Sequence, residues 1–202
     1  MMESNTIAAT VLTDVIEGLS LYAPPPRGFF RDVLNECLTR LYTEVLLERA
    51  ITDLRPNGRS VPLSDIPTLS GTPVRGEDIL SVSLDGRGAR YLCPEQLSVA
   101  SEVDAPYYTL EEEQILLSRE AKTLRVCFVL RPPLCTEENE ATYRIPLFPE
   151  FMPLLTARLR GEGYRAANED ALAAKCLEEY NHRLDGFVSY LTLARAAKGA
   201  RV

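Results

Sequence analysis

Few residues in this sequence have the types and spacing that catalysis requires. The chain contains a single histidine, His182, which lies between Asn181 and Arg183 in a segment with helical periodicity. Imidazole is the side chain that titrates nearest to neutral pH, so most acid–base, triad and metal chemistry that uses histidine would depend on this one residue. An exposed structural histidine is the favoured interpretation, and the sequence predicts no catalytic residue.

The cysteines and the acidic runs do not suggest a metal or cofactor site either. The five cysteines are odd in number and never form a Cys-x-x-Cys pair, so we expect reduced, unligated thiols at Cys37, Cys93, Cys127, Cys135 and Cys176. Three successive carboxylates at Glu111 to Glu113 point in different directions and lack the spacing of a calcium loop. The glycine pairs at 86–88 and 161–163 are not followed by Lys-Ser or Lys-Thr, so they are interpreted as turns.

The net charge of −7 and the pI near 4.9 argue against tight, sequence-independent binding of nucleic acid or anionic lipid. The distribution of charge is uneven: no acidic residue follows Asp185, whereas Arg195, Lys198 and Arg201 are basic. The N-terminus lacks the pattern of a signal peptide, and no apolar run reaches about 18 residues. We therefore expect synthesis in the cytoplasm and no association with a membrane.

Helical periodicity occurs at both ends of the chain. Apolar residues recur every three or four positions in four segments, which predict helices at 6–20, 29–47, 150–160 and 168–195. Thr6 is expected to lie near the N-cap of the first helix and Asn168 to cap the last one. Gly161 and Gly163 are expected to end the third helix.

The middle of the chain has the two-residue alternation of β-strands. Residues 49–63, with Asn57-Gly58 at their centre, predict a loosely paired hairpin. Alternating apolar residues predict further strands at 80–84, 108–110, 115–117 and 124–130. Together these segments predict a compact antiparallel β insertion over about residues 49–131.

The resulting fold class is α+β: mainly a helical bundle, made of two N-terminal and two C-terminal helices, with an inserted antiparallel β lobe and a long C-terminal helix. We expect one domain at 1–186 and a C-terminal extension at 187–202. The stripe of apolar residues in that extension is too wide for a helix that faces only solvent, so we expect a partner to cover it.

This order of elements resembles the head-to-tail adaptor proteins of tailed bacteriophages. The resemblance depends on Val33 to Leu38 with its central Leu34-Asn35-Glu36, and on Tyr108 to Leu117 followed by Leu124 to Pro133. It also depends on two groups nearer the C-terminus: Ile145-Pro146-Leu147 with Phe151 and Leu155, and Ala171, Ala174, Tyr180 and Leu184. It covers about residues 6–190, and its motifs are structural.

The resemblance implies a non-enzymatic virion component at the head–tail junction. It implies a ring of about twelve copies between the portal protein and the tail nozzle or another neck protein, through which genomic DNA passes without specific binding. We expect the C-terminal extension to dock on the portal through Phe187, Tyr190, Leu191, Arg195, Lys198 and Arg201. The alternatives are a small cytosolic phage protein that binds a host factor and an unrecognised enzyme.

Overall fold

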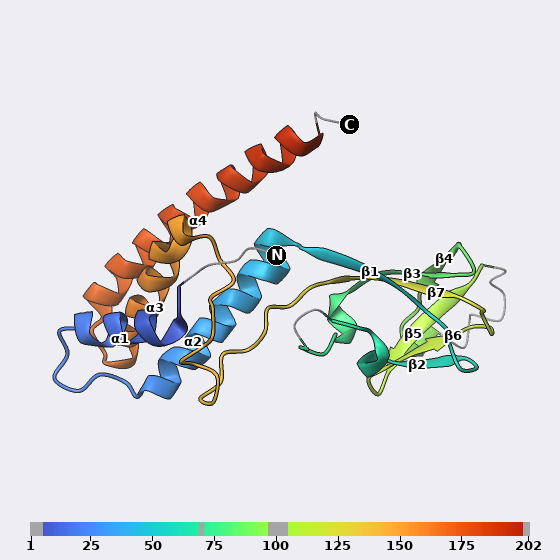
Figure 1. Ribbon diagram of the computed structural model, residues 1–202, viewed down its shortest axis with the longest axis horizontal. Helices are drawn as coiled ribbons and strands as arrows, with labels where there is room; N and C mark the ends of the chain where they lie inside the picture. The colour runs from blue at the N-terminus through green and yellow to red at the C-terminus, as the bar shows by residue number, and fades with distance from the viewer. Residues whose placement is uncertain (1–5, 69–70, 97–104, 200–202) are drawn as a thin grey trace. The chain divides into compact units, whose positions relative to one another are not determined.

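The computed structural model describes residues 6–68, 71–96 and 105–199, without the side chains of residues 195 and 197–199 (Figure 1). The chain divides into two compact units. Residues Met1–Leu41 and Leu134–Val202 form one, called the helical unit here, and residues Tyr42–Pro133 form the other, the β unit. The β unit is thus inserted between two parts of the helical unit along the sequence.

The helical unit contains helices in all four places where the sequence predicts them. They are α1 (Ala8–Gly18), α2 (Arg27–Arg40), α3 (Met152–Ala166, preceded by the 3-10 turn Pro149–Phe151) and α4 (Asp170–Gly199). Thr6 lies next to the N-cap residue of α1, as predicted, but the N-cap itself is Ile7 and no side chain caps the helix. The Ala8 N–H instead donates to the Tyr143 carbonyl (2.9 Å), so the returning chain satisfies this helix end.

Helix α3 runs through Gly161 and Gly163, contrary to the prediction that these glycines end it. Both glycines are positions of close helix contact. A Cβ on Gly161 would lie 2.9 Å from the Leu177 side chain of α4, and a Cβ on Gly163 would lie 2.8 Å from the Phe30 ring of α2. The missing side chains therefore allow α2 and α4 to approach α3, and the gain in packing outweighs the low helix propensity of glycine.

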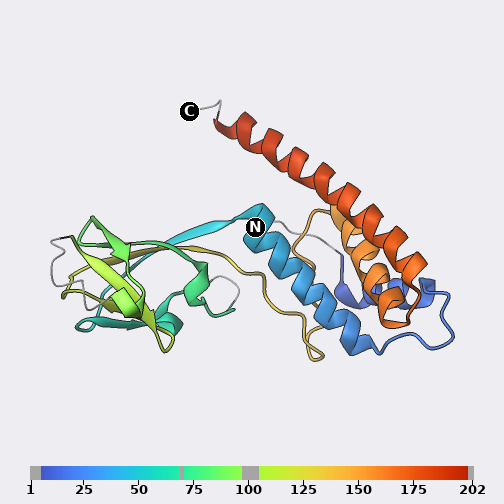
Figure 2. The ribbon, with the colours of Figure 1, turned by 180° about the vertical axis from the view of Figure 1, so that it is seen from behind.

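Helices α3 and α4 form a hairpin and lie side by side (Figure 2). The turn between them places Asn168 at a φ of 60°, in the left-handed region. Asn168 is thus a turn residue and not the predicted cap: the Glu169 carbonyl accepts from the Ala173 N–H (2.9 Å) as α4 begins. The core of the unit contains fully buried side chains from each of its four helices, among them Leu12, Phe30, Leu34, Leu38, Leu155, Leu159 and Phe187.

The second predicted helix changes its hydrogen-bond pattern near its end. Helix α2 stops at Arg40, and Leu41–Leu46 form a π-helix in which the Leu47 N–H donates to the Tyr42 carbonyl (2.9 Å). Leu47 then adopts a φ of 47°, which ends the helical path and leads into the first strand. The helix predicted over 29–47 thus lies where expected, but its last turn is a π-helix and not an α-helix.

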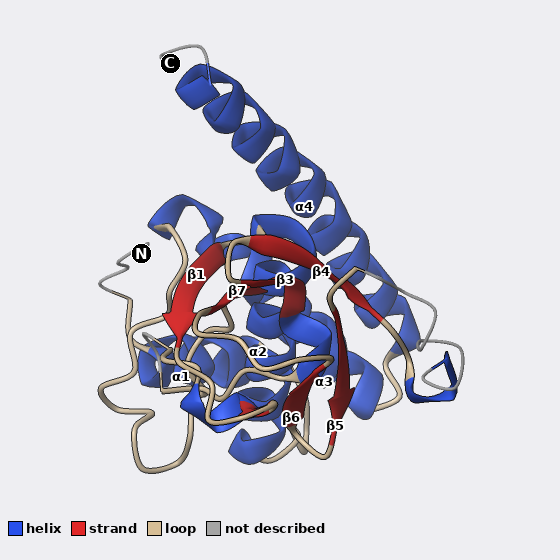
Figure 3. Ribbon diagram, turned by 90° about the vertical axis from the view of Figure 1, so that its right-hand side faces the viewer, coloured by secondary structure: helices blue, strands red, loops and turns tan. Residues whose placement is uncertain are grey.

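The described part of the β unit contains seven strands in one sheet, which curls into a half-barrel (Figure 3). They are β1 (Arg49–Leu54), β2 (Ser60–Pro62), β3 (Ile79–Leu84), β4 (Arg87–Tyr91), β5 (Tyr107–Glu111), β6 (Gln114–Leu117) and β7 (Leu124–Val129). Their spatial order is β1-β7-β3-β4-β5-β6-β2. Neighbouring strands are antiparallel except β4 and β5, which are parallel.

The sheet corrects the predicted fold class. The protein is α+β as expected, but a mainly helical bundle with a small β lobe is wrong, because the β unit has its own large core. The prediction of a wholly antiparallel insertion fails at the β4–β5 pair. Strand β4 was not predicted, since its sequence Arg-Gly-Ala-Arg-Tyr lacks an alternating apolar pattern.

The predicted hairpin over residues 49–63 does not form. Strand β1 pairs with β7 and β2 pairs with β6, so the two segments are at opposite edges of the sheet. Asn57-Gly58 does form a tight turn, with a φ of 77° at Gly58 and an isolated bridge from Asn57 to Ser60. The side chains of β1 and β2 that face the core pack against apolar side chains of distant strands. This burial, and not the local turn at Asn57-Gly58, determines which strands pair.

Strand β3 shows how a bulge changes which side chains are buried. Alternation predicts that Leu80, Val82 and Leu84 share one face, but Leu80 is 43% exposed whereas the other two are buried. The pairing with β7 shifts between Ile79 and Ser81, and Ile79 packs on the core in place of Leu80. A buried ion pair lies at the start of this strand, where Asp78 accepts from the Arg131 guanidinium at 2.7 Å.

Candidate interaction surfaces

An aromatic cluster surrounds the middle of α4. The ring centroids of Phe151 and Phe187 are 4.3 Å apart, and Tyr190 lies 5.3 Å from Phe151 and 6.3 Å from Phe148. Pro149 opens the 3-10 turn that carries Phe151 into α3. The turn thus places two aromatic rings against the α4 face that carries Phe187 and Tyr190.

This cluster determines where the predicted docking residues lie. Phe187 is fully buried and Leu191 is 7% exposed, so the helical unit already covers both side chains. Tyr190 packs at the edge of the cluster and is 47% exposed. Arg195 and Lys198 belong to α4, although their side chains are outside the described set, and Arg201 lies outside the described residues. The structure therefore gives Phe187 and Leu191 an internal role in packing, and their contact with a portal stays a prediction.

The end of α4 extends beyond its covering helix. With 30 residues α4 is about 45 Å long, whereas the 15 residues of α3 reach only about 22 Å (Figure 2). Beyond Leu191, the last buried residue among its described side chains, Leu193 is 72% exposed. Val188, within the covered part, is 43% exposed. Leu193 follows Tyr190 by three residues, so both lie on neighbouring positions of one helix face. Leu193 belongs to the same apolar stripe of the sequence as Phe187 and Leu191. Only the exposed fraction of its side chain in the structure separates Leu193 from these two covered residues.

The single histidine lies on an exposed surface. His182 lines a shallow depression with Glu150, Glu179 and Arg183, and it is itself exposed. Arg183 donates to the Glu179 carboxylate at 2.7 Å, an ion pair between residues one helical turn apart. The residues that line this depression include no serine, threonine or cysteine that His182 could activate.

Two thiols are buried in the helical unit. Burial raises the pKa of Cys37 to about 11, and Tyr180, which is hydrogen-bonded to this thiol, has its pKa raised to about 12 mainly by burial as well. Burial also raises the pKa of Cys135 to about 11. A thiol with a raised pKa is largely protonated at neutral pH and is therefore a poor nucleophile. These two cysteines act as small apolar core residues.

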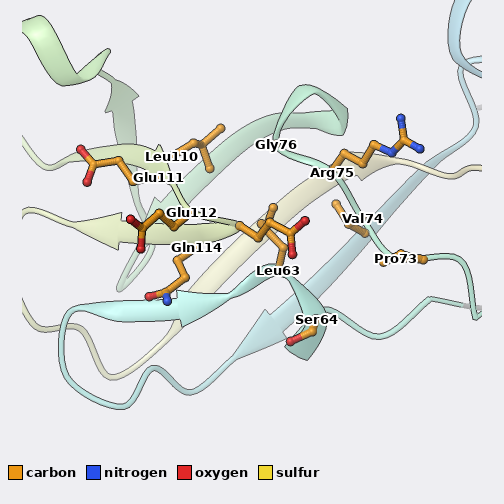
Figure 4. A pocket seen from close by; sticks show the side chains of 11 residues that line it. Leu63, Ser64, Pro73, Val74, Arg75, Gly76, Leu110, Glu111, Glu112 and Gln114 are labelled. Carbon is orange, nitrogen blue, oxygen red and sulfur yellow. The ribbon is translucent and has the colours of Figure 1, made fainter.

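The β unit has a pocket of about 590 Å³ beside the β5–β6 turn (Figure 4). Its apolar side chains are Leu63 and Val74, which are buried, together with Pro73 and Leu110. The Leu63 N–H donates to the Glu113 carbonyl (2.8 Å), which ties the two sides of the pocket together. A Cβ on Gly76 would lie 3.3 Å from Leu110, so a larger residue there would press on the floor.

The rim of this pocket is acidic. Glu111, Glu112 and Glu113 line it, and the one arginine in the lining, Arg75, lies 3.7 Å from Glu77. Glu112 and Glu113 have φ values of 47° and 60°, as the tight turn requires, so the three carboxylates follow a sharply turning backbone. No group of three His, Cys, Asp or Glu side chains that could hold a metal ion occurs in the described part of the chain. The pocket is suited to binding an apolar group that carries positive charge.

Two polar contacts in the helical unit escaped the sequence-based prediction. The Asn35 amide donates to the Cys135 carbonyl (2.9 Å) and accepts from the Cys135 N–H (2.8 Å). Glu140 is only 8% exposed, and the Arg27 guanidinium donates to its carboxylate at 2.6 Å. Both contacts fix the loop that returns from the β unit. Asn35 belongs to the polar side of its helix in the sequence, and its partner lies far away along the chain, so no local pattern indicated this contact.

Among the described helices, none is both long and apolar enough to cross a bilayer. The sequence matches no protein-family model and no curated protein sequence.

Proposed function

We propose that this chain is a structural virion protein, a head-to-tail adaptor of a tailed bacteriophage. In this proposal about twelve copies form a ring beneath the portal protein at the head–tail junction. The ring joins the capsid to the tail nozzle or to another neck protein. It seals or continues the DNA channel and lets the genome pass at ejection.

The observation that carries the proposal is the free end of α4. A helix that served only its own unit would end near Leu191, the last buried residue among its described side chains. Instead α4 continues to Gly199 and exposes Leu193 beyond the covered part. An apolar side chain that is 72% exposed on a projecting helix is the type of residue that a partner groove covers.

Burial narrows the predicted docking contact. Phe187 and Leu191 hold α4 against the unit, so the apolar part of the contact is assigned to Tyr190 and Leu193. The basic residues Arg195, Lys198 and Arg201 follow directly in the sequence. They are proposed to meet acidic groups of the portal, where a guanidinium can bind a carboxylate through two hydrogen bonds.

The charge of the chain also suits this role. Each copy carries a net charge of −7, so a ring would repel the DNA backbone rather than hold it. At physiological ionic strength this repulsion acts only within about 8 Å of the surface. DNA can thus move through the channel without being bound to its wall.

Capture by cognate portal rings tests the proposal. We expect the full chain to form a ring-shaped complex with the portal, and we expect Leu193→Asp to weaken capture at least tenfold. A truncation after Leu191 should abolish capture while the helical circular dichroism of the remaining residues persists. Truncation before Phe187 is a poorer test, because it also removes a fully buried ring from the core.

The matched control is Leu172→Asp in the first turn of α4. Leu172 is also partly exposed, at 43%, and the change of chemistry is the same, but the residue is at the other end of the helix. It should leave capture unchanged. Full-strength capture by the Leu193→Asp variant, or no capture by the unaltered chain, would contradict the proposed role of α4.

A further inference from the structure

Strand β1 is an edge of the sheet with an open side. In the order of described strands it pairs with β7 on one side only. Its six residues contain no proline or glycine and show no bulge against β7. Ile51 at its centre is 66% exposed. A regular edge strand of this length is a template for pairing with another strand, so the question is which strand it accepts.

The hydrogen bonds to β7 show which backbone groups of β1 are free. The Leu130 N–H donates to the Glu48 carbonyl (2.8 Å), and hydrogen-bonded pairs alternate along an antiparallel ladder. In the observed register, Ala50, Thr52 and Leu54 therefore bond to β7. The N–H and C=O groups of Arg49, Ile51 and Asp53 point to the open side, two residues apart.

We propose that β1 pairs antiparallel with β1 of a second copy, about a two-fold axis at Ile51. In this register Ile51 faces Ile51 of the second copy, and Arg49 faces Asp53 at both ends. All three residues with outward backbone groups then form hydrogen-bonded pairs, which gives six backbone hydrogen bonds. Their side chains share the exposed face of the sheet, so opposite charges meet directly across the new interface.

Neighbouring registers fit less well. A shift by one residue sets outward backbone groups against residues whose groups already bond to β7. A shift by two in one direction places Arg49 opposite Ile51, and a shift by two in the other places Arg49 opposite Arg55. The strand is therefore complementary to itself in one register, and this charge pattern selects a second copy over an unrelated strand.

The existing contacts of β1 are compatible with this pairing. Asp53 already accepts from Arg125 of β7 at 2.7 Å and 2.9 Å, and it is about half exposed. Pairing would place Arg49 of the second copy on its other side, so one carboxylate would lie between two guanidinium groups. Ala50 and Leu54 continue to face the core of the β unit and are not required to move.

The pairing does not depend on the proposed adaptor role. A two-fold axis is absent from a purely cyclic ring, so this dimer would be a form of the free chain and not a ring contact. Its formation is measured on the isolated protein, whereas the adaptor role is measured with the portal, so the two can fail separately.

Sedimentation of the full chain at micromolar to millimolar concentration tests the inference. We expect a reversible monomer–dimer equilibrium, and Arg49→Asp should weaken it by about tenfold or more, because two attractive pairs become repulsive. Asp53→Arg should do the same. An equimolar mixture of the two variants should restore dimers, because a carboxylate of one variant then faces a guanidinium of the other at both ends of the paired strands.

A backbone test complements the charge test. Ile51→Pro removes an N–H that points away from β7, so the β unit should stay folded while dimerisation is lost. Arg59→Asp, which makes the same charge change in the exposed β1–β2 loop, is the control and should dimerise normally. A monomer throughout the concentration range, dimers in the Ile51→Pro variant, or failure of the mixed pair to associate would overturn the proposal.

Discussion

The helical unit and the β unit differ in where the backbone hydrogen bonds of their elements form: a helix closes them within its own segment, whereas a strand closes them with another segment. In the helical unit, α3 and α4 are joined by a short turn at Asn168 and pack along their length. In the β unit, β1 pairs with β7 at the far end of the insertion, and β2 pairs with β6. Local periodicity therefore predicts the first unit well, whereas the second depends on partners that a local pattern cannot specify.

The two units also differ in what they leave for other molecules. The helical unit exposes an apolar side chain, Leu193, on a projecting helix. The β unit exposes backbone groups along β1 and an acidic pocket at the β5–β6 turn. Side chains on a helix can match a groove of unrelated shape, whereas a strand edge requires another strand. We therefore assign the first surface to a different protein and the second to a copy of the same chain.

The largest effect is expected in the core of the β unit. Phe128 of β7 is 1% exposed, and Phe128→Ala should destabilise the protein by about 3–5 kcal/mol. Hydrogen exchange should show the loss of protection in β3 and β7 before that in α3 and α4, because the two units have separate cores. The control is Leu80→Ala, which changes a side chain that the bulge leaves 43% exposed and should have little effect. Equal destabilisation by both variants would contradict the described register of β3.

The next effect concerns the buried ion pair of the β unit. Asp78 is 3% exposed and lies 2.7 Å from the Arg131 guanidinium, whose other carboxylate partner, the exposed Glu77, lies at 2.6 Å. Asp78→Asn removes the buried partner of this guanidinium and should cost about 3 kcal/mol in denaturant unfolding. In the helical unit, Glu179→Gln removes an exposed pair with Arg183 and should cost under about 0.5 kcal/mol. Similar losses of unfolding free energy in the two variants would contradict the expectation that the buried ion pair contributes more to stability than the exposed one.

Alkaline pH should weaken the helical unit through its thiols. The pKa of Cys37 is raised to about 11 in the folded chain, so the unfolded chain releases this proton at lower pH than the folded chain does. The contribution of this thiol to the free energy of unfolding should therefore be fully present below about pH 9. It should fall by about 2 kcal/mol as the pH rises toward 11. Cys37→Ala should reduce the pH dependence but not abolish it, because burial also raises the pKa of Cys135 to about 11. A wild-type profile that stays flat to pH 11 would contradict the buried, protonated thiol.

The smallest expected effect tests the helix contact at Gly163. A Cβ there would lie 2.8 Å from Phe30 and 2.9 Å from Leu19, so Gly163→Ala should destabilise the protein by about 1–2 kcal/mol despite the better helix propensity of alanine. Gly186 in α4 has no atom within 4 Å of the corresponding position. Gly186→Ala should therefore stabilise by about 0.5–1 kcal/mol. The same sign for both substitutions in thermal unfolding would contradict this assignment.

The sequence predicts the position of each α-helix in the described part of the chain, because apolar spacing is a local property. It misplaces the end of α3, since Gly161 and Gly163 are explained only by the helices packed against them. The strands with apolar alternation are found at β3, β5, β6 and β7, whereas β4 lacks that pattern. Pairing partners depend on burial between distant segments, which explains the wrong hairpin at 49–63.

For the predicted docking surface, the structure shows only which of its side chains the chain itself covers. The residues from Phe187 onward form an apolar stripe. Such a stripe indicates that other side chains cover it, but it does not indicate whether they belong to the same chain or to a partner. The ring of Phe151 covers Phe187, and it comes from a turn before the preceding helix. Only the packed structure can separate residues covered by the chain itself from Leu193, which stays exposed.

The central claim is that the chain assembles as a ring on the portal through the end of α4. Native mass spectrometry of the portal mixed with this protein measures the number of bound copies directly. We expect about twelve chains for each portal ring, and we expect that number to fall to none for the chain truncated after Leu191. Binding of a single copy, a full complement of truncated chains, or no complex with the unaltered protein would contradict the claim.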